Sequence, residues 1–118
     1  MKTELRDKYP KILTGVTITT PDGWFTILDN LCLLIRGRLK YEKGISQVVA
    51  VQIKEKFGEL RFYYTGGDQY VAGLVAMAEA MSTVTCENCG HPGESRRPGW
   101  VATLCDECNN KRKENDIQ

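Results

Sequence analysis

Two Cys-x-x-Cys pairs constrain this chain more than any other feature of its sequence. Cys86 and Cys89 form the first pair, Cys105 and Cys108 form the second, and fifteen residues separate them. Each pair turns two thiolates toward a common point, and the loop between the pairs is long enough to return as a hairpin. Four sulfurs then complete a tetrahedral Zn²⁺ shell, which leaves no open position for a catalytic water. The sequence therefore predicts a structural zinc ion.

Other uses of the five cysteines fit the sequence less well. The first ten residues contain no apolar segment of a signal peptide, which disfavours a secreted disulfide scaffold. Neither pair opens a helix of a thioredoxin-like unit, which disfavours a redox role. An iron–sulfur site or cysteines without metal stay open as alternatives. Cys32 lies in an apolar run and is expected to be buried, and His91 is a weaker candidate ligand because four thiolates already satisfy the metal.

A chain of 118 residues suits one compact domain followed by a metal-stabilised module too small to bury a core of its own. We expect the core domain to span residues 1–83 and the zinc-binding module, with a polar tail, to span residues 84–118. No segment approaches the roughly 18 apolar residues that a membrane-spanning helix needs. A cytoplasmic protein with no membrane association is therefore expected, and the oligomeric state stays open.

Hydrophobic periodicity predicts two helices, over residues 24–41 and 69–82, and a β-hairpin over residues 47–64 between them. Asp68 is placed to cap the second helix, and Gly37 is expected to mark a close backbone approach or an early end of the first. Leu34 and Met81 belong to the apolar stripes expected to face inward. The predicted fold class is α+β: two helices packed on a small antiparallel sheet, followed by a C-terminal four-cysteine zinc ribbon or treble-clef-like module.

Glycine at the first position of a two-residue loop favours a type II′ turn, so the hairpin is expected to turn at Gly58 and Glu59. Lys56 would then lie opposite Arg61, which is unfavourable in isolation but suits an anion. One face of the ribbon would be apolar. The other face would carry three cations and an aromatic residue: Lys54, Lys56, Arg61 and Tyr63.

Three blocks of the sequence carry a resemblance to known proteins. They are Gly23-Trp24-Phe25, the segment KEKFGELRFYY over residues 54–64, and CENCG followed by Trp100 and TLCDEC. Together they resemble a group of small zinc-knuckle proteins, mostly uncharacterised, of temperate phages, prophages and bacteria. The similarity covers roughly residues 22–108. It implies a phage or bacterial cytoplasmic origin, implies that the position of His91 is not a metal ligand, and carries no activity with it.

Charge is distributed unevenly along the chain. Residues 36–63 contain seven basic and three acidic residues, a net charge of +4. Residues 84–118 contain five basic and six acidic residues, and four thiolates with one Zn²⁺ bring that module to about −3. A nucleic-acid-binding domain is usually strongly basic as a whole, so only the central segment has the charge that suits a phosphate backbone.

These patterns support a binding protein in which the basic and aromatic hairpin face captures an anionic ligand, either nucleic acid or a nucleotide. The loop between the two cysteine pairs, residues 90–104, is called the zinc loop. Three of its residues are candidates to extend that face: Arg96, Arg97 and Trp100. The alternative is an inhibitor or adaptor that binds a protein of a host machine, for example a defence system, through an exposed anchor such as Trp100. An enzyme is not expected, because the chain has one histidine and no HExxH, Walker A or GxSxG motif.

Overall fold

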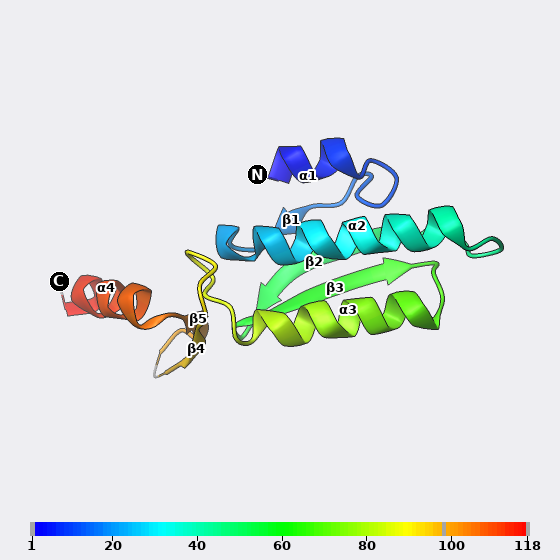
Figure 1. Cartoon of the computed structure of the whole chain (residues 1–118). Helices are drawn as coiled ribbons and strands as arrows, with labels where there is room; N and C mark the ends of the chain where they lie inside the picture. Colours follow the sequence, from blue (N-terminus) through cyan, green and yellow to red (C-terminus); the bar gives the residue numbers. More distant parts are fainter. Residues whose placement is uncertain (1, 98, 118) are drawn as a thin grey trace.

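The computed structural model describes residues 2–97 and 99–117, with side chains as far as residue 114. Figure 1 shows a mixed α/β body that holds α1, α2, α3 and one sheet, with the C-terminal elements gathered beyond one end of it. In chain order the elements are α1 (Lys2–Lys8), β1 (Ile18–Thr19), the 3-10 turn η1 (Asp22–Trp24), α2 (Phe25–Tyr41), β2 (Val49–Lys56), β3 (Glu59–Thr65), α3 (Gln69–Ser82), β4 (Glu94–Arg96), β5 (Ala102–Leu104) and α4 (Asp106–Ile117).

The larger sheet has the order β1-β2-β3 and is mixed. Strand β1 runs parallel to β2, with Ile18 opposite Ile53, and β3 is antiparallel to β2. The prediction of an antiparallel sheet is therefore wrong for its first strand. The physical reason is the connection: α2 carries the chain from β1 back to the start of β2, and a crossover helix of this kind joins parallel neighbours.

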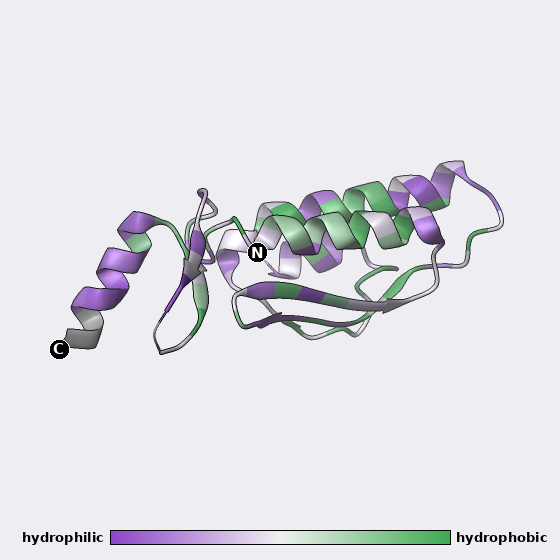
Figure 2. Ribbon diagram, turned by 90° about the horizontal axis from the view of Figure 1, so that it is seen from below, coloured by the Kyte–Doolittle hydropathy of each residue, from purple (hydrophilic) through white to green (hydrophobic). Residues whose placement is uncertain are grey.

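Helices α2 and α3 lie together on one side of this sheet, as Figure 2 shows, and the core fills the space between them and the strands. Leu60 and Ile53 from the strands and Ile35 from α2 are almost completely buried there. Helix α2 continues to Tyr41, and a Cβ added at Gly37 would meet no atom within 4 Å, so the expectation of a close approach or early helix end there is wrong. Of the helices in the described part of the chain, none is long and apolar enough to cross a membrane.

The hairpin between β2 and β3 turns one residue earlier than predicted. Phe57 and Gly58 form the loop, both with positive φ (53° and 81°), the backbone of a type I′ turn. Lys56 therefore pairs with Glu59, and Lys54 pairs with Arg61, which corrects the expected pairing of Lys56 with Arg61. The turn is held by the carboxylate of Glu55, which accepts a hydrogen bond from the Gly58 N–H at 2.8 Å.

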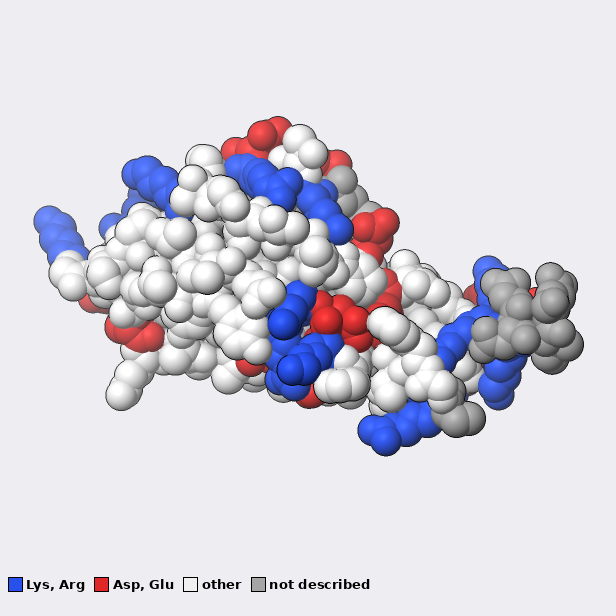
Figure 3. Space-filling view, turned by 180° about the vertical axis from the view of Figure 1, so that it is seen from behind, with Lys and Arg blue, Asp and Glu red and all other residues white. Residues whose placement is uncertain are grey.

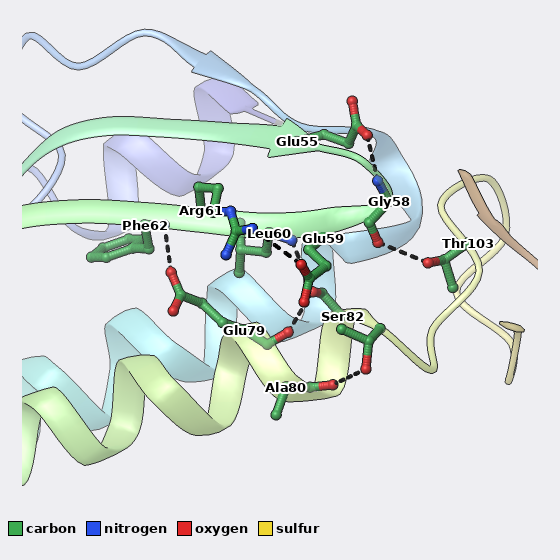
Figure 4. Close-up of polar contacts among 11 residues, drawn as sticks. Glu55, Gly58, Glu59, Leu60, Arg61, Phe62, Glu79, Ala80, Ser82 and Thr103 are labelled. Carbon is green, nitrogen blue, oxygen red and sulfur yellow. Dashed lines mark hydrogen bonds and ion pairs between the residues drawn. The ribbon is translucent and has the colours of Figure 1, made fainter. Parts of the chain in front are cut away.

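The free edge of β3 is capped by side chains of α3. The backbone N–H of Leu60 donates to Ser82 Oγ at 2.9 Å, and the N–H of Phe62 donates to Glu79 Oε2 at 3.0 Å (Figure 4). Ser82 is fully buried, and its hydroxyl donates in turn to the Glu79 carbonyl at 2.6 Å. Two edge N–H groups that could recruit another strand are therefore satisfied within the chain.

Candidate metal centre

The first cysteine pair lies in a tight turn that follows α3. The Cys86 N–H donates to the His91 carbonyl at 2.7 Å, and the Gly90 N–H returns to the Cys86 carbonyl at 3.0 Å. Gly90 has a φ of 80°, a conformation that glycine adopts without strain. The backbone is thereby folded so that Cys86 and Cys89 turn their sulfurs to the same side.

The second pair lies where strand β5 passes into helix α4. Cys105 follows the strand directly, and Cys108 is in the first turn of the helix. The Cys108 N–H donates to Cys105 Sγ at 3.4 Å, and the Asn109 N–H donates to the Cys105 carbonyl at 2.9 Å. Helix α4 thus begins directly after Cys105, and its first turn carries a candidate ligand.

The four Sγ atoms of Cys86, Cys89, Cys105 and Cys108 lie within 4.8 Å of one another. Cys89 Sγ and Cys105 Sγ are 3.6 Å apart. Sulfurs about 2.3 Å from a central zinc form a tetrahedron with edges of about 3.8 Å, so the spacing and the donor chemistry fit a zinc site with four thiolate ligands. The cysteines could hold a metal ion of this kind.

The electrostatics of the four thiols differ from one cysteine to the next. Burial pushes the pKa of Cys86 upward, but hydrogen bonds from the backbone at Cys105, Cys89 and Asn88 outweigh it and lower the pKa to about 6. The pKa of Cys108 is raised to about 12, first by its hydrogen bond with Cys105 and then by burial. A bound divalent cation would stabilise the thiolate form of each cysteine, because cysteine binds a metal in its deprotonated form.

His91 lies beside this cluster rather than inside it. Its Nδ1 is 3.2 Å from Cys89 Sγ, and the residue is exposed. An imidazole at that distance can form a hydrogen bond to a thiolate that already binds metal. The group of four cysteines that could hold a metal ion does not include it.

The first cysteine pair is attached to the core domain by backbone contacts. The Gly23 N–H donates to the Glu87 carbonyl at 2.7 Å, and a Cβ at Gly23 would lie 2.1 Å from the Cys86 carbonyl oxygen. The indole of Trp24, which is fully buried, donates from Nε1 to the Thr85 carbonyl at 3.0 Å. Only glycine allows the two backbones to approach this closely. Gly23 and Trp24 therefore hold the turn that carries Cys86 and Cys89, called the metal turn, against the core domain.

A second contact joins strand β5 to the tip of the β2–β3 hairpin, called the core hairpin. The hydroxyl of Thr103 donates to the Gly58 carbonyl at 2.7 Å (Figure 4). Thr103 also makes two hydrogen bonds with Glu87. The Glu87 N–H donates to the Thr103 carbonyl at 2.9 Å, and the Thr103 N–H donates to the Glu87 side chain, at Oε2, at 2.5 Å. Burial raises the pKa of the Glu87 carboxyl, and the Thr103 N–H opposes that rise. Sequence patterns did not single out Thr103 or Glu87.

The predicted ligand-binding residues on the core hairpin share the sheet face away from α2 and α3. Figure 3 shows this side of the molecule, with a group of basic side chains beside acidic ones near the middle of the view. Lys54 lies 5.9 Å from the centre of the Tyr63 ring, and Arg61 makes an ion pair with Glu59 at 3.1 Å. The positive charge of this face is therefore partly compensated.

The zinc-loop candidates have different environments. The Arg96 guanidinium contacts Glu94 at 3.1 Å and Asp106 at 2.7 Å and donates to the Leu104 carbonyl, so it ties the β4–β5 hairpin to the start of α4. Arg97 is exposed, and Trp100 is 76 % exposed. Arg96 is engaged within the module, whereas Arg97 and Trp100 face solvent.

One hollow brings two of the predicted residues together. It has a volume of about 340 Å³ and lies between the core hairpin tip and the zinc loop, with Lys56 and Trp100 in its lining. The remaining lining residues are Glu55, Phe57, Gly99 and Val101. Phe57 was not a predicted site residue; its exposure of 70 % in a left-handed conformation is a feature that only the turn geometry reveals.

No family model, no curated protein and no solved structure matches this chain.

Proposed function

We propose that this chain is a non-enzymatic binding protein, stabilised by a structural Zn²⁺, that captures an anionic nucleic acid or nucleotide beside its hairpin tip. The observation that carries the proposal is the hollow in which Lys56 from the core hairpin and Trp100 from the zinc loop lie together. The phage or bacterial origin implied by the resemblance stays a prediction.

The zinc part of the proposal rests on the order of elements around the cysteines. A tight turn, a short β-hairpin and a helix whose first turn bears Cys108 follow one another, as in the treble-clef alternative of the two modules predicted. Four thiolates hold Zn²⁺ in a closed shell, and zinc binding contributes about 10 to 16 kcal/mol to folding in small zinc peptides. The ion would thereby hold the zinc loop in place beside the core hairpin.

The binding part rests on two exposed aromatic rings. Phe57 is 70 % exposed and Trp100 is 76 % exposed, and both line the hollow. Phe57 has a φ of 53°, which costs a residue with a Cβ about 1 to 2 kcal/mol. A strained backbone that keeps a large apolar ring in water is typical of a binding site. Aromatic rings stack on bases, and the neighbouring Lys56 offers a positive charge to a phosphate.

Tryptophan fluorescence tests this directly, because the chain has two tryptophans and Trp24 is fully buried. A twelve-nucleotide oligothymidylate and AMP would each be titrated into the zinc-loaded chain. We expect saturable quenching that weakens steeply from low to moderate salt. Trp100→Phe should abolish the quenching, and Lys56→Gln should weaken binding. Unaltered fluorescence and no binding by calorimetry with either probe would contradict the proposal.

A protein-binding role is the second candidate, favoured by an apolar groove between α2 and α3. Its lining includes Leu34, Leu74, Met77 and Met81, and Met77 is 63 % exposed. Leu34 and Met81 are about half exposed, which corrects the expectation that they face inward. Binding of a protein through this groove would tolerate salt, unlike capture of a nucleic acid. A partner lost on Met77→Glu but retained in Trp100→Phe would support this function.

A further inference from the structure

A second hollow, of about 450 Å³, lies where the end of α1 and the segment after it meet α2 and the start of the hairpin. Its lining contains four cationic residues and no acidic one among the residues that the structure describes. The cations are Lys8, Lys11, Arg36 and Lys40; the other lining residues are Tyr9, Pro10, Ile12, Leu39 and Gln47. None of the lining residues belongs to the hairpin site or the cysteine cluster.

Arg36 is held in place at this hollow. Its terminal nitrogen Nη1 donates to the Lys8 carbonyl at 3.1 Å, and its guanidinium lies 4.9 Å from the centre of the Tyr9 ring. Tyr9 is only 2 % exposed, and its hydroxyl donates to Asp29 Oδ1 at 2.7 Å. The guanidinium is therefore oriented before any ligand arrives, which lowers the entropy lost on binding.

The positive charge of the hollow exceeds the negative charge near it. Asp29 pairs with Lys8 at 2.7 Å. Across the described residues, no carboxylate lies within 4.0 Å of a charged nitrogen of Lys11, Arg36 or Lys40. Four cations less the carboxylate of Asp29 leave a surplus of three positive charges.

Stabilisation of helix C-termini explains the positions of only some of these four cations. Lys8 and Lys40 lie in the last turns of α1 and α2, where a cation stabilises the helix dipole. Arg36 lies before the last turn of α2, and Lys11 lies outside both helices. Arg36 and Lys40 are also four residues apart on one helix face, a like-charge pair that destabilises a helix.

We propose that this hollow binds a small molecule bearing a di- or triphosphate, such as a nucleoside diphosphate. A guanidinium can hold a phosphate through two parallel hydrogen bonds, and the lysines add charge around it. The volume lies within the range of small-ligand sites, and Pro10, Ile12 and Leu39 supply apolar walls for the uncharged part of the ligand. The cations gather around one hollow, which suits a compact polyphosphate rather than an extended nucleic-acid backbone.

Calorimetric titration of the full zinc-loaded chain tests the proposal with three probes: inorganic pyrophosphate, ADP and a twelve-nucleotide oligothymidylate. The test variant is Lys11→Gln with Lys40→Gln, because both side chains are exposed and their loss leaves the core intact. The matched control is Lys43→Gln with Lys113→Gln, which removes the same charge at exposed positions outside both hollows. A third variant, Arg36→Lys, keeps the charge but removes the two-pronged donor.

ADP and pyrophosphate should bind the parent chain and the control variant equally. The Lys11→Gln, Lys40→Gln variant should bind each at least about tenfold more weakly, and Arg36→Lys should also weaken both. No binding of ADP and pyrophosphate, or equal binding by parent and test variant, would overturn the proposal. Binding of the oligonucleotide alone, lost in the test variant, would assign the hollow to nucleic acid and overturn it as well.

This inference does not rest on the function proposed for the hairpin tip. Neither tryptophan lines the second hollow, so ADP bound there should be seen by calorimetry in Trp100→Phe as in the parent. Absence of quenching at Trp100 would therefore count against the function proposed for the hairpin tip, and absence of ADP binding at the second hollow would count against this inference alone.

Discussion

The indole Nε1 of Trp24 donates a hydrogen bond to the carbonyl of Thr85, at 3.0 Å and across 61 residues of sequence. Thr85 immediately precedes Cys86, so this bond joins the start of α2 to the entry of the metal-binding turn. Gly23 makes the adjacent contact with Glu87. The metal turn is therefore held against the core domain by these hydrogen bonds as well as by its covalent connection to α3.

Trp24→Phe should lower the free energy of unfolding by about 1 to 3 kcal/mol, because it removes the indole donor and leaves the Thr85 carbonyl without that partner. Urea denaturation followed by circular dichroism measures the change. Trp100→Phe is the matched control: Trp100 is 76 % exposed, so its replacement should alter stability by less than about 0.5 kcal/mol. Equal free energies of unfolding for the two variants would show that the Trp24 indole does not stabilise the contact with Thr85.

Gly23→Ala should disrupt the seating of the metal turn, since its Cβ would lie 2.1 Å from the Cys86 carbonyl oxygen and 2.4 Å from that of Glu87. We expect a loss of several kcal/mol, of the size that backbone clashes and buried strain produce. Gly37→Ala in α2 is the control, because its Cβ would meet no atom within 4 Å and should stabilise the helix by about 0.5 to 1 kcal/mol. A Gly23→Ala protein with the same melting temperature as the parent would contradict the close approach of Gly23 to the metal turn.

Cys86→Ser should unfold residues 84–118 and leave the core hairpin domain partly folded, because zinc binding and folding of the module are coupled. Limited proteolysis with mass spectrometry should find early cleavage in that segment. Removing metal from the parent with a chelator should give the same fragments. The predicted boundary between residues 83 and 84 would be contradicted if the variant resisted protease as well as the parent does.

Asp68 should make stability depend on pH at the acidic end. It caps α3 by accepting the Val71 N–H at 3.1 Å, and it pairs with Arg38 at 2.9 Å. The N–H of Val71 first, and Arg38 with it, hold the pKa of Asp68 below its ordinary value of 3.8. The stabilising charge is thus fully present above pH 3.8 and is lost as the pH falls through the lowered pKa.

Thermal melts of the parent and Asp68→Asn between pH 7 and pH 2 measure this effect. The parent should melt at the higher temperature at pH 7, and the gap should close toward pH 2 as Asp68 becomes protonated. Asparagine keeps a capping oxygen, so the gap reports the charge rather than the cap. A gap that stays constant over this range would show that the carboxylate charge contributes nothing.

Local patterns were sufficient for part of this structure. Cysteine spacing predicted the cluster because the geometry of each pair is set within four residues, and Asp68 was predicted as the cap of α3 from the residues beside it. Burial of Cys32, which raises the pKa of its thiol to about 12, followed from its apolar neighbours.

The remaining features depend on contacts between distant segments. Strand β1 pairs in parallel with β2, and the paired residues Ile18 and Ile53 are 35 positions apart in the sequence. The periodicity of apolar residues within a strand does not determine which strand it pairs with. The hairpin turn was misplaced because Phe57, a residue seldom found at positive φ, occupies the first loop position. Thr103 contacts Gly58 across 45 residues, and the hollow around Tyr9 combines α2 with the segment after α1. No local motif marks either arrangement.

X-ray absorption spectroscopy at the zinc edge, on freshly isolated protein whose metal content has been determined, tests the central claim most directly. We expect one zinc per chain, surrounded by four sulfur atoms at about 2.3 Å and no nitrogen ligand. Less than one metal per chain, or a shell in which His91 nitrogen replaces a cysteine sulfur, would contradict it.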